Sequence, residues 1–386
     1  MKKLFSLIIC FEILSSIAVY GEASALTVGA PIPDNLISAK SSILMEAATG
    51  EILQEFNSSE KLPIASVTKT MTMLLIMEAL ESGKITLTDM VPTSEHAASM
   101  GGSQVFLEVG EQMPVGDMLK AIAVASGNDA SAAMAEFISG SEPAFVELMN
   151  KRAGELGAAN THFLNCNGLN ESAEHYSSAY DVALISRELL RHPQIFDYTT
   201  IWMDSLRGGA FGLANTNKLI RFYSGANGLK TGSTDAARYC LSATAKRENM
   251  QLIAVILGAP TTDDRFEGAK KLLDYGFANF SLVDESVMAA PLPDVTVTGG
   301  IVNKVAVSVP DISFLVPKGA QNKIDIDIKM VSEVKAPVKA GDKAGEIIFT
   351  SAGAEVAKRD ILTKVDVGRI TLDKMLVKMM IGWLKY

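Results

Sequence analysis

The sequence is poor in the residues that most often mark metal and disulfide chemistry. Its 386 residues include 3 Cys and 4 His. The cysteines show no C-x-x-C spacing and the histidines no H-E-x-x-H pattern, so we expect neither a metal nor another cofactor. Cys10 lies in the N-terminal apolar run. The other two, Cys166 and Cys240, are expected to be small buried hydrophobic side chains, although one disulfide between them stays open.

Basic charge is scarce as well. The chain has 35 Lys and Arg against 44 Asp and Glu, a net charge of −9, with no basic block in its main body. A nucleic-acid partner is therefore not expected, because a phosphate backbone needs concentrated positive charge. With 48% apolar and 20% charged residues, the chain is typical of globular proteins. Its length indicates two domains, or one large domain with an appendage.

The first 25 residues have the pattern of a secretory signal. Lys2 and Lys3 precede an apolar run. Ala23-Ser24-Ala25 forms a small-x-small cleavage motif, so the mature chain is expected to begin near Leu26. The run is interrupted by a glutamate and is short of the roughly 20 apolar residues that span a bilayer. We therefore expect cleavage and export, with an uncleaved membrane anchor as the competing interpretation.

Residues 26–285 show the pattern of an α+β domain. Two apolar runs within 41–56 predict a β-hairpin, and strands are expected at 229–232, 239–245 and 251–258. Helices are expected at 66–80, 115–125, 130–140, 145–156, 179–191 and 264–280. Strands at both ends of the segment, with helices between them, predict that the first and last strands share one sheet.

Two further segments follow. Residues 286–366 alternate apolar and polar side chains, with strands expected at 295–297, 305–309 and 324–329 and a turn at 341–346, which predicts a small all-β domain. On a helical wheel, residues 367–386 place three lysines together, with an apolar face opposite. Four basic residues against one acid give a local charge of 4 − 1 = +3. We expect an amphipathic helix on a membrane surface; the alternative is a terminal helix packed on its own domain.

Three short motifs indicate the chemistry: Ser66-Val67-Thr68-Lys69, Ser126-Gly127-Asn128 and Lys230-Thr231-Gly232. Each alone is a weak signal, but their order and their context of helix and strand are informative. A spacing of three on a helix lets the amine of Lys69 reach the hydroxyl of Ser66. A serine hydroxyl needs a base to become a nucleophile. Lys69 can act as that base if burial and the charge of Lys230 lower its pKa.

The second motif supplies two further candidates. Ser126 is expected to relay the proton to the leaving group. Asn128 is expected to orient Lys69 and the amide of the substrate.

The third motif is expected to bind the substrate. The backbone N–H groups of Ser66 and Ser233 would form an oxyanion hole. Lys230 and Thr231 suit a substrate carboxylate, and Gly232 permits a ligand to approach the strand closely.

These blocks resemble the serine D-Ala-D-Ala carboxypeptidases, which are low-molecular-mass penicillin-binding proteins, over nearly the whole mature chain. The resemblance includes residues 63–72, 125–130, 167–169, 175–179 and 228–237. It implies a catalytic domain like that of serine β-lactamases and penicillin-binding proteins, with an antiparallel sheet and a helical subdomain, followed by the small β domain and the tail.

The same resemblance implies an activity and a location. The enzyme would remove the terminal D-Ala from peptidoglycan stem peptides through an acyl-enzyme on Ser66, and β-lactams would acylate that serine. Attachment to the outer face of the cytoplasmic membrane is also implied. Some family members carry His where this chain has Ser233, which bears on side-chain preference.

Three alternatives remain open from the sequence. A secreted β-lactamase would need a deacylating base such as Glu171 or Glu174, although solvated loop carboxylates are favoured. An S-x-x-K esterase and a non-catalytic wall-binding protein are the others. His175 is expected to pack or hydrogen-bond near the site or to be structural. Arg247 and Arg265 can meet a carboxylate, but ordinary solvated charges are favoured.

Overall fold

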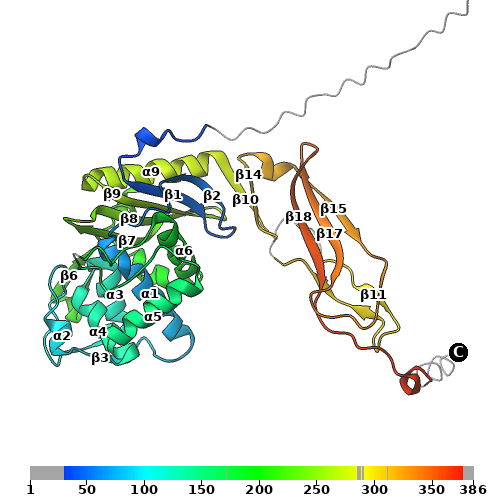
Figure 1. The fold of residues 1–386 in the computed structure, drawn as a ribbon, viewed down its shortest axis with the longest axis horizontal. Coiled ribbons are helices and arrows are strands. Elements are labelled where there is room, and N and C mark those ends of the chain that lie inside the picture. The colour runs from blue at the N-terminus through cyan, green and yellow to red at the C-terminus, as the bar shows by residue number, and fades with distance from the viewer. Residues whose placement is uncertain (1–29, 171, 285–287, 289–290, 311, 377–386) are drawn as a thin grey trace, which may run out of the picture. The chain divides into compact units, whose positions relative to one another are not determined.

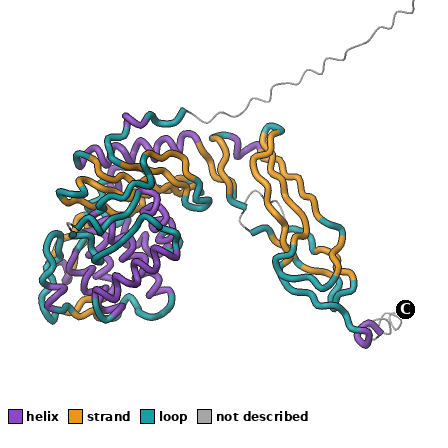
Figure 2. The backbone as a smooth tube through the Cα atoms, viewed as in Figure 1, coloured by secondary structure: helices purple, strands orange, loops and turns teal. Residues whose placement is uncertain are grey.

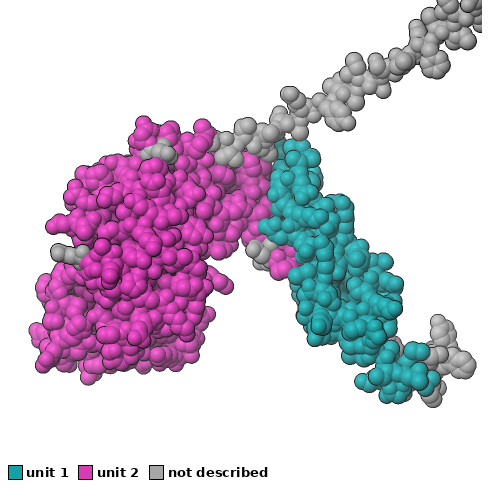
Figure 3. All heavy atoms as spheres, in the orientation of Figure 1, with its two compact units in different colours: residues 1–27, 293–308, 322–386 teal, residues 28–292, 309–321 magenta. Residues whose placement is uncertain are grey.

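The structure is a computed structural model that describes residues 30–170, 172–284, 288, 291–310 and 312–376. The expected signal at 1–25 and residues 377–386 of the expected tail helix lie outside the described residues. The chain divides into two compact units, coloured separately in Figure 3. The large unit holds Val28–Leu292 and Val309–Gln321, and the small unit holds Pro293–Ser308 and Asn322–Tyr386.

An antiparallel sheet of five strands, in the order β2-β1-β9-β8-β7, forms the frame of the large unit (Figure 1). β1 (Ser41–Glu46) and β2 (Ile52–Phe56) are the predicted hairpin. β7 (Ala226–Thr234), β8 (Arg238–Arg247) and β9 (Met250–Ala259) are the three predicted later strands. Because β1 pairs directly with β9, the first and last segments share one sheet, as predicted.

Both faces of this sheet are buried. On β9, Ile253 and Val255 pack with the main helical core, whereas Leu252 and Ala254 pack toward α9 (Thr262–Asn279). Successive side chains of a strand point to opposite faces, so a strand covered on both sides is apolar throughout. This explains the uninterrupted apolar run from Leu252 to Leu257. Figure 2 shows α9, in purple, along one side of this sheet, and the other long helices of the large unit on the opposite side.

The helices expected between the strands are all present. They are α1 (Lys69–Glu81), α3 (Val115–Ala125), α4 (Asn128–Ser139), α5 (Glu142–Glu155) and α6 (Ala179–Leu189). Two short strand pairs lie outside the main sheet: β3 (Met90–Pro92) pairs with β4 (Gln112–Pro114), and β5 (Met203–Leu206) pairs with β6 (Phe211–Ala214). The short helices of the unit are η1 (Asp34–Leu36), α2 (Glu95–Ala98), η3 (Pro193–Ile195), α7 (Phe196–Thr199), η4 (Arg207–Gly209) and α8 (Leu219–Phe222).

Several helix starts differ from the predicted ones by two or three residues; α4 begins at Asn128 and α5 at Glu142, ahead of the expected 130 and 145. The segment expected to be helical from Ser66 begins with a 3-10 turn, η2 (Ala65–Thr68), and α1 starts only at Lys69. Ala65 enters this turn with φ of 47°, in the left-handed region, so a regular helix cannot extend back through it. Most of α1 is buried, and the Lys69 side chain is buried with it.

Two strands end the large unit. β10 (Phe280–Val283) follows α9 and pairs with β14 (Phe314–Pro317), which η6 (Ala320–Lys323) follows. Residues 309–321, expected in the all-β segment, therefore belong to the large unit by their contacts.

The small unit consists of strands. β11 (Val295–Thr298), β12 (Lys304–Val305) and β16 (Glu333–Lys335) form one sheet; β13 (Val307–Ser308), β15 (Ile324–Met330), β17 (Lys343–Ser351) and β18 (Ala354–Thr363) form another. The strand expected at 305–309 is split at Ala306, where the chain passes from one sheet to the other. β17 starts at Lys343, inside the segment expected to be a turn.

Past the last strand, residues 372–376 are helical, and Leu372 and Leu376 are exposed. Within the part of the chain that the structure describes, no helix combines the length and the apolar character needed to cross a bilayer.

Candidate active site

The large unit brings the three motifs together. Ser66 lies in η2, and Lys69 opens α1 one turn later. Ser126 and Asn128 lie where α3 ends and α4 begins. The third motif lies on β7, the edge strand that packs against η2. The predicted convergence of distant segments is therefore present.

Lys69 is at the centre of this arrangement. Its Nζ lies 3.0 Å from Ser66 Oγ, 2.6 Å from Asn128 Oδ1 and 2.8 Å from the carbonyl oxygen of Asn167. The predicted contacts of Lys69 with Ser66 and Asn128 are present. Asn167 appeared in the sequence analysis only as part of a resembling block. A backbone carbonyl carries no residue signal, so spacing alone had no means of finding this contact.

The environment of Lys69 favours a neutral amine. Burial lowers the pKa of Lys69 to about 7, although the charges of Cys166 and Asp129 raise it in part. Burial lowers the pKa of Lys230 well below its usual value, and the charges of Lys69 and Arg265 lower it further. Burial is thus the largest cause at both lysines, and the repulsion between the two ammonium groups disfavours both being charged at once.

Two of the partners of Lys69 are groups that can only accept a hydrogen bond. The Nδ2 of Asn128 donates to the carbonyl of Gly101 at 2.7 Å, so its Oδ1 faces Lys69. This oxygen and the carbonyl of Asn167 can only accept. A neutral amine has two N–H groups, and these two acceptors engage both. In that neutral form, the lone pair of Nζ is left for the hydroxyl of Ser66, 3.0 Å away.

The strand β7 is held tightly against the turn that carries Ser66. A Cβ on Gly232 would lie 2.7 Å from the carbonyl oxygen of Ile64 and 2.9 Å from the backbone nitrogens of Ser66 and Val67. Gly232 was expected to permit the close approach of a ligand. In the structure, the chain's own backbone makes the close approach.

The side chains of β7 differ in exposure. Lys230 is buried and its Nζ donates to the carbonyl of Thr231 at 3.0 Å. The hydroxyl of Thr231 donates to Thr216 at 2.7 Å. Ser233 is exposed. Its side chain thus borders solvent, where a substrate can reach it.

Ser126 has an unusual backbone. It caps α3 with φ of 65°, a left-handed conformation that is uncommon outside glycine, asparagine and aspartate. Its side chain is buried at 4% exposure. Strained positions of this kind cluster at functional sites.

His175 packs against the turn that carries Ser66 and Thr68. Its Nδ1 accepts from the backbone N–H of Leu164 at 3.1 Å, so its Nε2 carries the hydrogen and donates to Thr68 Oγ1 at 2.8 Å. Burial lowers the pKa of His175 to about 4. The predicted position near the site is confirmed, as a neutral structural histidine.

The two arginines have different environments. Arg265 is 7% exposed, so its interpretation as a solvated charge is wrong; its Nη1 donates to the carbonyl of Gly232 at 3.1 Å. An isolated arginine in a helix has no local pattern that marks this contact. Arg247 is partly exposed and lies 3.7 Å from Asp274, so it does meet a carboxylate.

The remaining candidates are two glutamates and two cysteines. Glu174 is exposed, as expected for a solvated loop carboxylate, and Glu171 lies outside the described residues. Cys166 and Cys240 are buried and free, and burial raises the pKa of both thiols. Their interpretation as small hydrophobic side chains is confirmed, and no disulfide joins them.

A cleft opens beside the motifs. It has a volume of about 720 Å³ and is lined by Leu169, Asn170 and residues 233–236. These residues continue directly from Asn167, which contacts Lys69, and from Gly232, which packs against the Ser66 turn. The cleft is large enough for a small-molecule or peptide end.

Solved structures with the same fold define the class of protein. Penicillin-binding protein 5 from Haemophilus influenzae is 33% identical, with a TM-score of 0.77 over 88% of this chain and 100% of that one. Penicillin-binding protein D2 from Listeria monocytogenes, solved in its ampicillin-bound form, is 30% identical, with a TM-score of 0.58 over 64% of this chain and 100% of that one. The fold is that of the penicillin-binding proteins.

Family comparisons are more specific. Residues 26–261 match the D-alanyl-D-alanine carboxypeptidase family, and residues 287–369 match the C-terminal domain of penicillin-binding protein 5. The D-alanyl-D-alanine carboxypeptidase DacF of Bacillus subtilis is 46% identical over 90% of both chains. DacC of Escherichia coli is 34% identical over 89% of this chain and 87% of that one. The chain belongs to the D-alanyl-D-alanine carboxypeptidase family and is a hydrolase of that activity.

Proposed function

We propose that Ser66 is the nucleophile of this carboxypeptidase and that Lys69 is its base. The observation that carries the proposal is the position of Lys69 Nζ, which lies 3.0 Å from the Ser66 hydroxyl and is held by two groups that can only accept. Ser66 Oγ adds to the carbonyl carbon of the penultimate D-Ala and gives its proton to Lys69 Nζ. The peptide C–N bond then breaks, and an ester on Ser66 remains.

Ser126 is proposed to pass the proton from Lys69 to the leaving nitrogen, so that the terminal D-Ala departs as a neutral amine. Water then hydrolyses the ester and restores the free serine. Asn128 is proposed to orient Lys69. Its amide already contacts Gly101 and Lys69, so a contact with the substrate amide is the less supported part of its expected role.

The substrate is proposed to lie along β7. The backbone N–H groups of Ser66 and Ser233 would stabilise the oxyanion, a contribution of about 3 kcal/mol for each donor. The tight packing of Gly232 against the Ser66 turn supports this pairing. Lys230 and Thr231 are proposed to hold the terminal carboxylate. β-Lactams are proposed to occupy the same cleft and to acylate Ser66.

Labelling with a fluorescent penicillin tests the nucleophile. Ser66→Ala should lose both labelling and D-Ala release, because no other hydroxyl replaces the one facing Lys69. Ser224→Ala is a matched control, since this serine is exposed and lies in the turn before β7, outside all three motifs. Labelling of Ser66→Ala at the unchanged rate would overturn the assignment. Measuring penicillin turnover beside D-Ala release separates a carboxypeptidase from a β-lactamase.

The cellular location is also a proposal. We propose that residues 1–25 direct export and that residues 367–386 attach the enzyme to the outer face of the cytoplasmic membrane, where it trims stem peptides of the wall. The exposed Leu372, Met375 and Leu376 support a surface-seeking helix. A chain ending at residue 366 should no longer sediment with anionic vesicles, while the full mature chain should. Equal sedimentation of both would contradict the anchor.

A further inference from the structure

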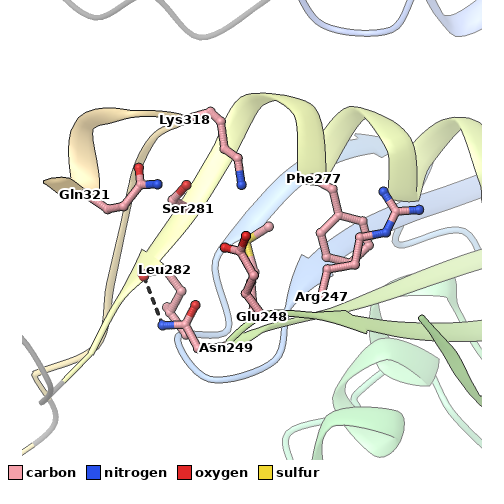
Figure 4. Close-up of a pocket in the computed structure, with 9 residues that line it drawn as sticks. Arg247, Glu248, Asn249, Phe277, Ser281, Leu282, Lys318 and Gln321 are labelled. Carbon is pink, nitrogen blue, oxygen red and sulfur yellow. Dashed lines mark hydrogen bonds between the residues drawn. The ribbon is translucent and has the colours of Figure 1, made fainter. Parts of the chain in front are cut away.

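A second cavity lies at the other end of the sheet from Ser66. It has a volume of about 240 Å³ and is lined by Arg247, Glu248, Asn249, Met250, Phe277, Ser281, Leu282, Lys318 and Gln321 (Figure 4). Gly232 pairs with Cys240 on β8, and the cavity begins seven residues further along that strand, at Arg247. At roughly 3.4 Å per residue this is on the order of 24 Å from the catalytic motif.

The cavity contains a buried hydroxyl that has no partner. Ser281, on β10, is 6% exposed, and its Oγ makes no hydrogen bond within the part of the chain that the structure describes. A buried polar atom without a partner costs about 1–3 kcal/mol. In Figure 4 this hydroxyl is drawn with Gln321 on one side and Lys318 on the other. A ligand atom in the cavity would satisfy it.

Charges of both signs face the same space. Figure 4 shows the carboxylate of Glu248 and the ammonium of Lys318 pointing toward one another. Among the described residues, neither side chain forms an ion pair with the other or with a third residue. Glu248 also adopts φ of 53° in the tight turn between β8 and β9, a conformation that costs energy for a side chain of this type.

The other charged group of the cavity is already engaged. The Arg247 guanidinium lies 4.5 Å from the ring centre of Phe277 and 4.9 Å from that of Tyr223, and it also contacts Asp274 at 3.7 Å. It therefore forms part of the wall. Met250 and Leu282 supply an apolar floor. Lys318 is left as the cation, and Glu248 as the anion, that a ligand can meet.

We propose that this cavity binds a small α-amino acid as its zwitterion. The ligand carboxylate contacts Lys318 and the Ser281 hydroxyl, and its ammonium group contacts Glu248. A volume of about 240 Å³ is below the roughly 300–1,000 Å³ typical of drug-sized ligands and suits a molecule of this size. D-Alanine, which the carboxypeptidase reaction releases, has this chemistry. The site would then sense the product at a distance from the catalytic serine.

Equilibrium dialysis with radiolabelled D-alanine tests this proposal on the mature enzyme after acylation by penicillin, which blocks the active-site cleft. The acylated enzyme should bind one equivalent. D-Lactate lacks the ammonium group and D-alaninamide lacks the carboxylate, so neither should compete at concentrations where D-alanine does. Competition by D-lactate equal to that of D-alanine would overturn the zwitterion assignment, as would no binding of D-alanine at all.

Three variants locate the binding. Glu248→Gln, Lys318→Gln and Ser281→Ala should each weaken D-alanine binding by about tenfold or more, because each removes a contact to a charged group of the ligand. Lys246→Gln is the matched control, since this exposed lysine lies on β8 next to the cavity but does not line it. All four variants should retain penicillin labelling, which reports correct folding. Unchanged binding in the three cavity variants would place D-alanine elsewhere and refute the proposal.

Discussion

Nη1 of Arg265 donates a hydrogen bond to the carbonyl oxygen of Gly232 at 3.1 Å, across the boundary between α9 and β7. The guanidinium also lies 4.9 Å from the ring centre of Phe266 and 5.5 Å from that of Tyr239. A buried cation on the far helix thus supports the strand that carries the third motif. Its charge also contributes to the low pKa of Lys230.

The first prediction concerns this hydrogen bond. Arg265→Ala leaves the carbonyl of Gly232 without its side-chain donor and should lower the free energy of unfolding by about 1–3 kcal/mol. Urea denaturation measures this. Arg221→Ala, at an exposed position, should change it by less than about 0.5 kcal/mol. Equal stability of the two variants would show that the buried contact contributes nothing.

The second prediction concerns the packing of β7 against the Ser66 turn. Gly232→Ala places a methyl group 2.7 Å from the carbonyl oxygen of Ile64, so the strand or the turn must move. Overpacking of this kind costs about 1–3 kcal/mol, and the displacement should also slow acylation by penicillin at least tenfold. Urea denaturation and stopped-flow labelling measure the two effects.

A second glycine serves as the control for that change. Gly154 lies within α5, with no atom within 4 Å of an added Cβ. Gly154→Ala should therefore stabilise the protein by about 0.5–1 kcal/mol, because alanine restricts the unfolded chain and favours the helix. If Gly232→Ala stabilised the protein as Gly154→Ala does, β7 would not pack as closely against the turn as the structure shows.

Much of this architecture was predictable from local patterns. The five central helices and the strands of the main sheet follow from apolar runs and helical composition, and the contact between Lys69 and Ser66 follows from their spacing of three. The prediction of one strand at 305–309 was wrong, because the alternation of apolar and polar residues does not show which strand each residue pairs with. Ala306 separates two short strands that belong to different sheets.

The unpredicted parts of the site depend on tertiary contacts. The carbonyl of Asn167 reaches Lys69 from a loop 98 residues further along the chain, and Arg265 reaches Gly232 across 33 residues. Neither contact leaves a local signal, because the first uses a backbone atom and the second a single arginine in an ordinary helix. Both contacts form in the buried interior, and which groups are buried together depends on the whole fold.

The third prediction concerns His175 and acid. Its pKa in the folded state is about 4, below the ordinary value of 6.5, so the unfolded chain takes up a proton first as the pH falls. The free energy of unfolding that comes from keeping His175 neutral is therefore lost as the pH falls from 6.5 toward 4. Between pH 7 and pH 5 the loss should be about 2 kcal/mol, measured by urea denaturation.

His175→Gln isolates this effect. Glutamine keeps a donor for Thr68 Oγ1 but does not titrate, so the difference in stability between pH 7 and pH 5 should be about 2 kcal/mol smaller in the variant. The remaining acid sensitivity is common to both proteins and cancels. An identical pH dependence in the two proteins would mean that His175 is not held neutral by burial.

The fourth prediction concerns the base. If Lys69 acts as a neutral amine with a pKa of about 7, the rate of acylation by penicillin should be about tenfold lower at pH 6 than at pH 8. Asn128→Asp replaces a neutral acceptor 2.6 Å from Lys69 by a carboxylate, which favours the ammonium form and should move the midpoint up by about 1–3 pH units. Stopped-flow labelling across pH 5–10 records both midpoints. A rate independent of pH in the parent enzyme, or a midpoint that Asn128→Asp leaves in place, would exclude Lys69 as the group that takes the proton from Ser66.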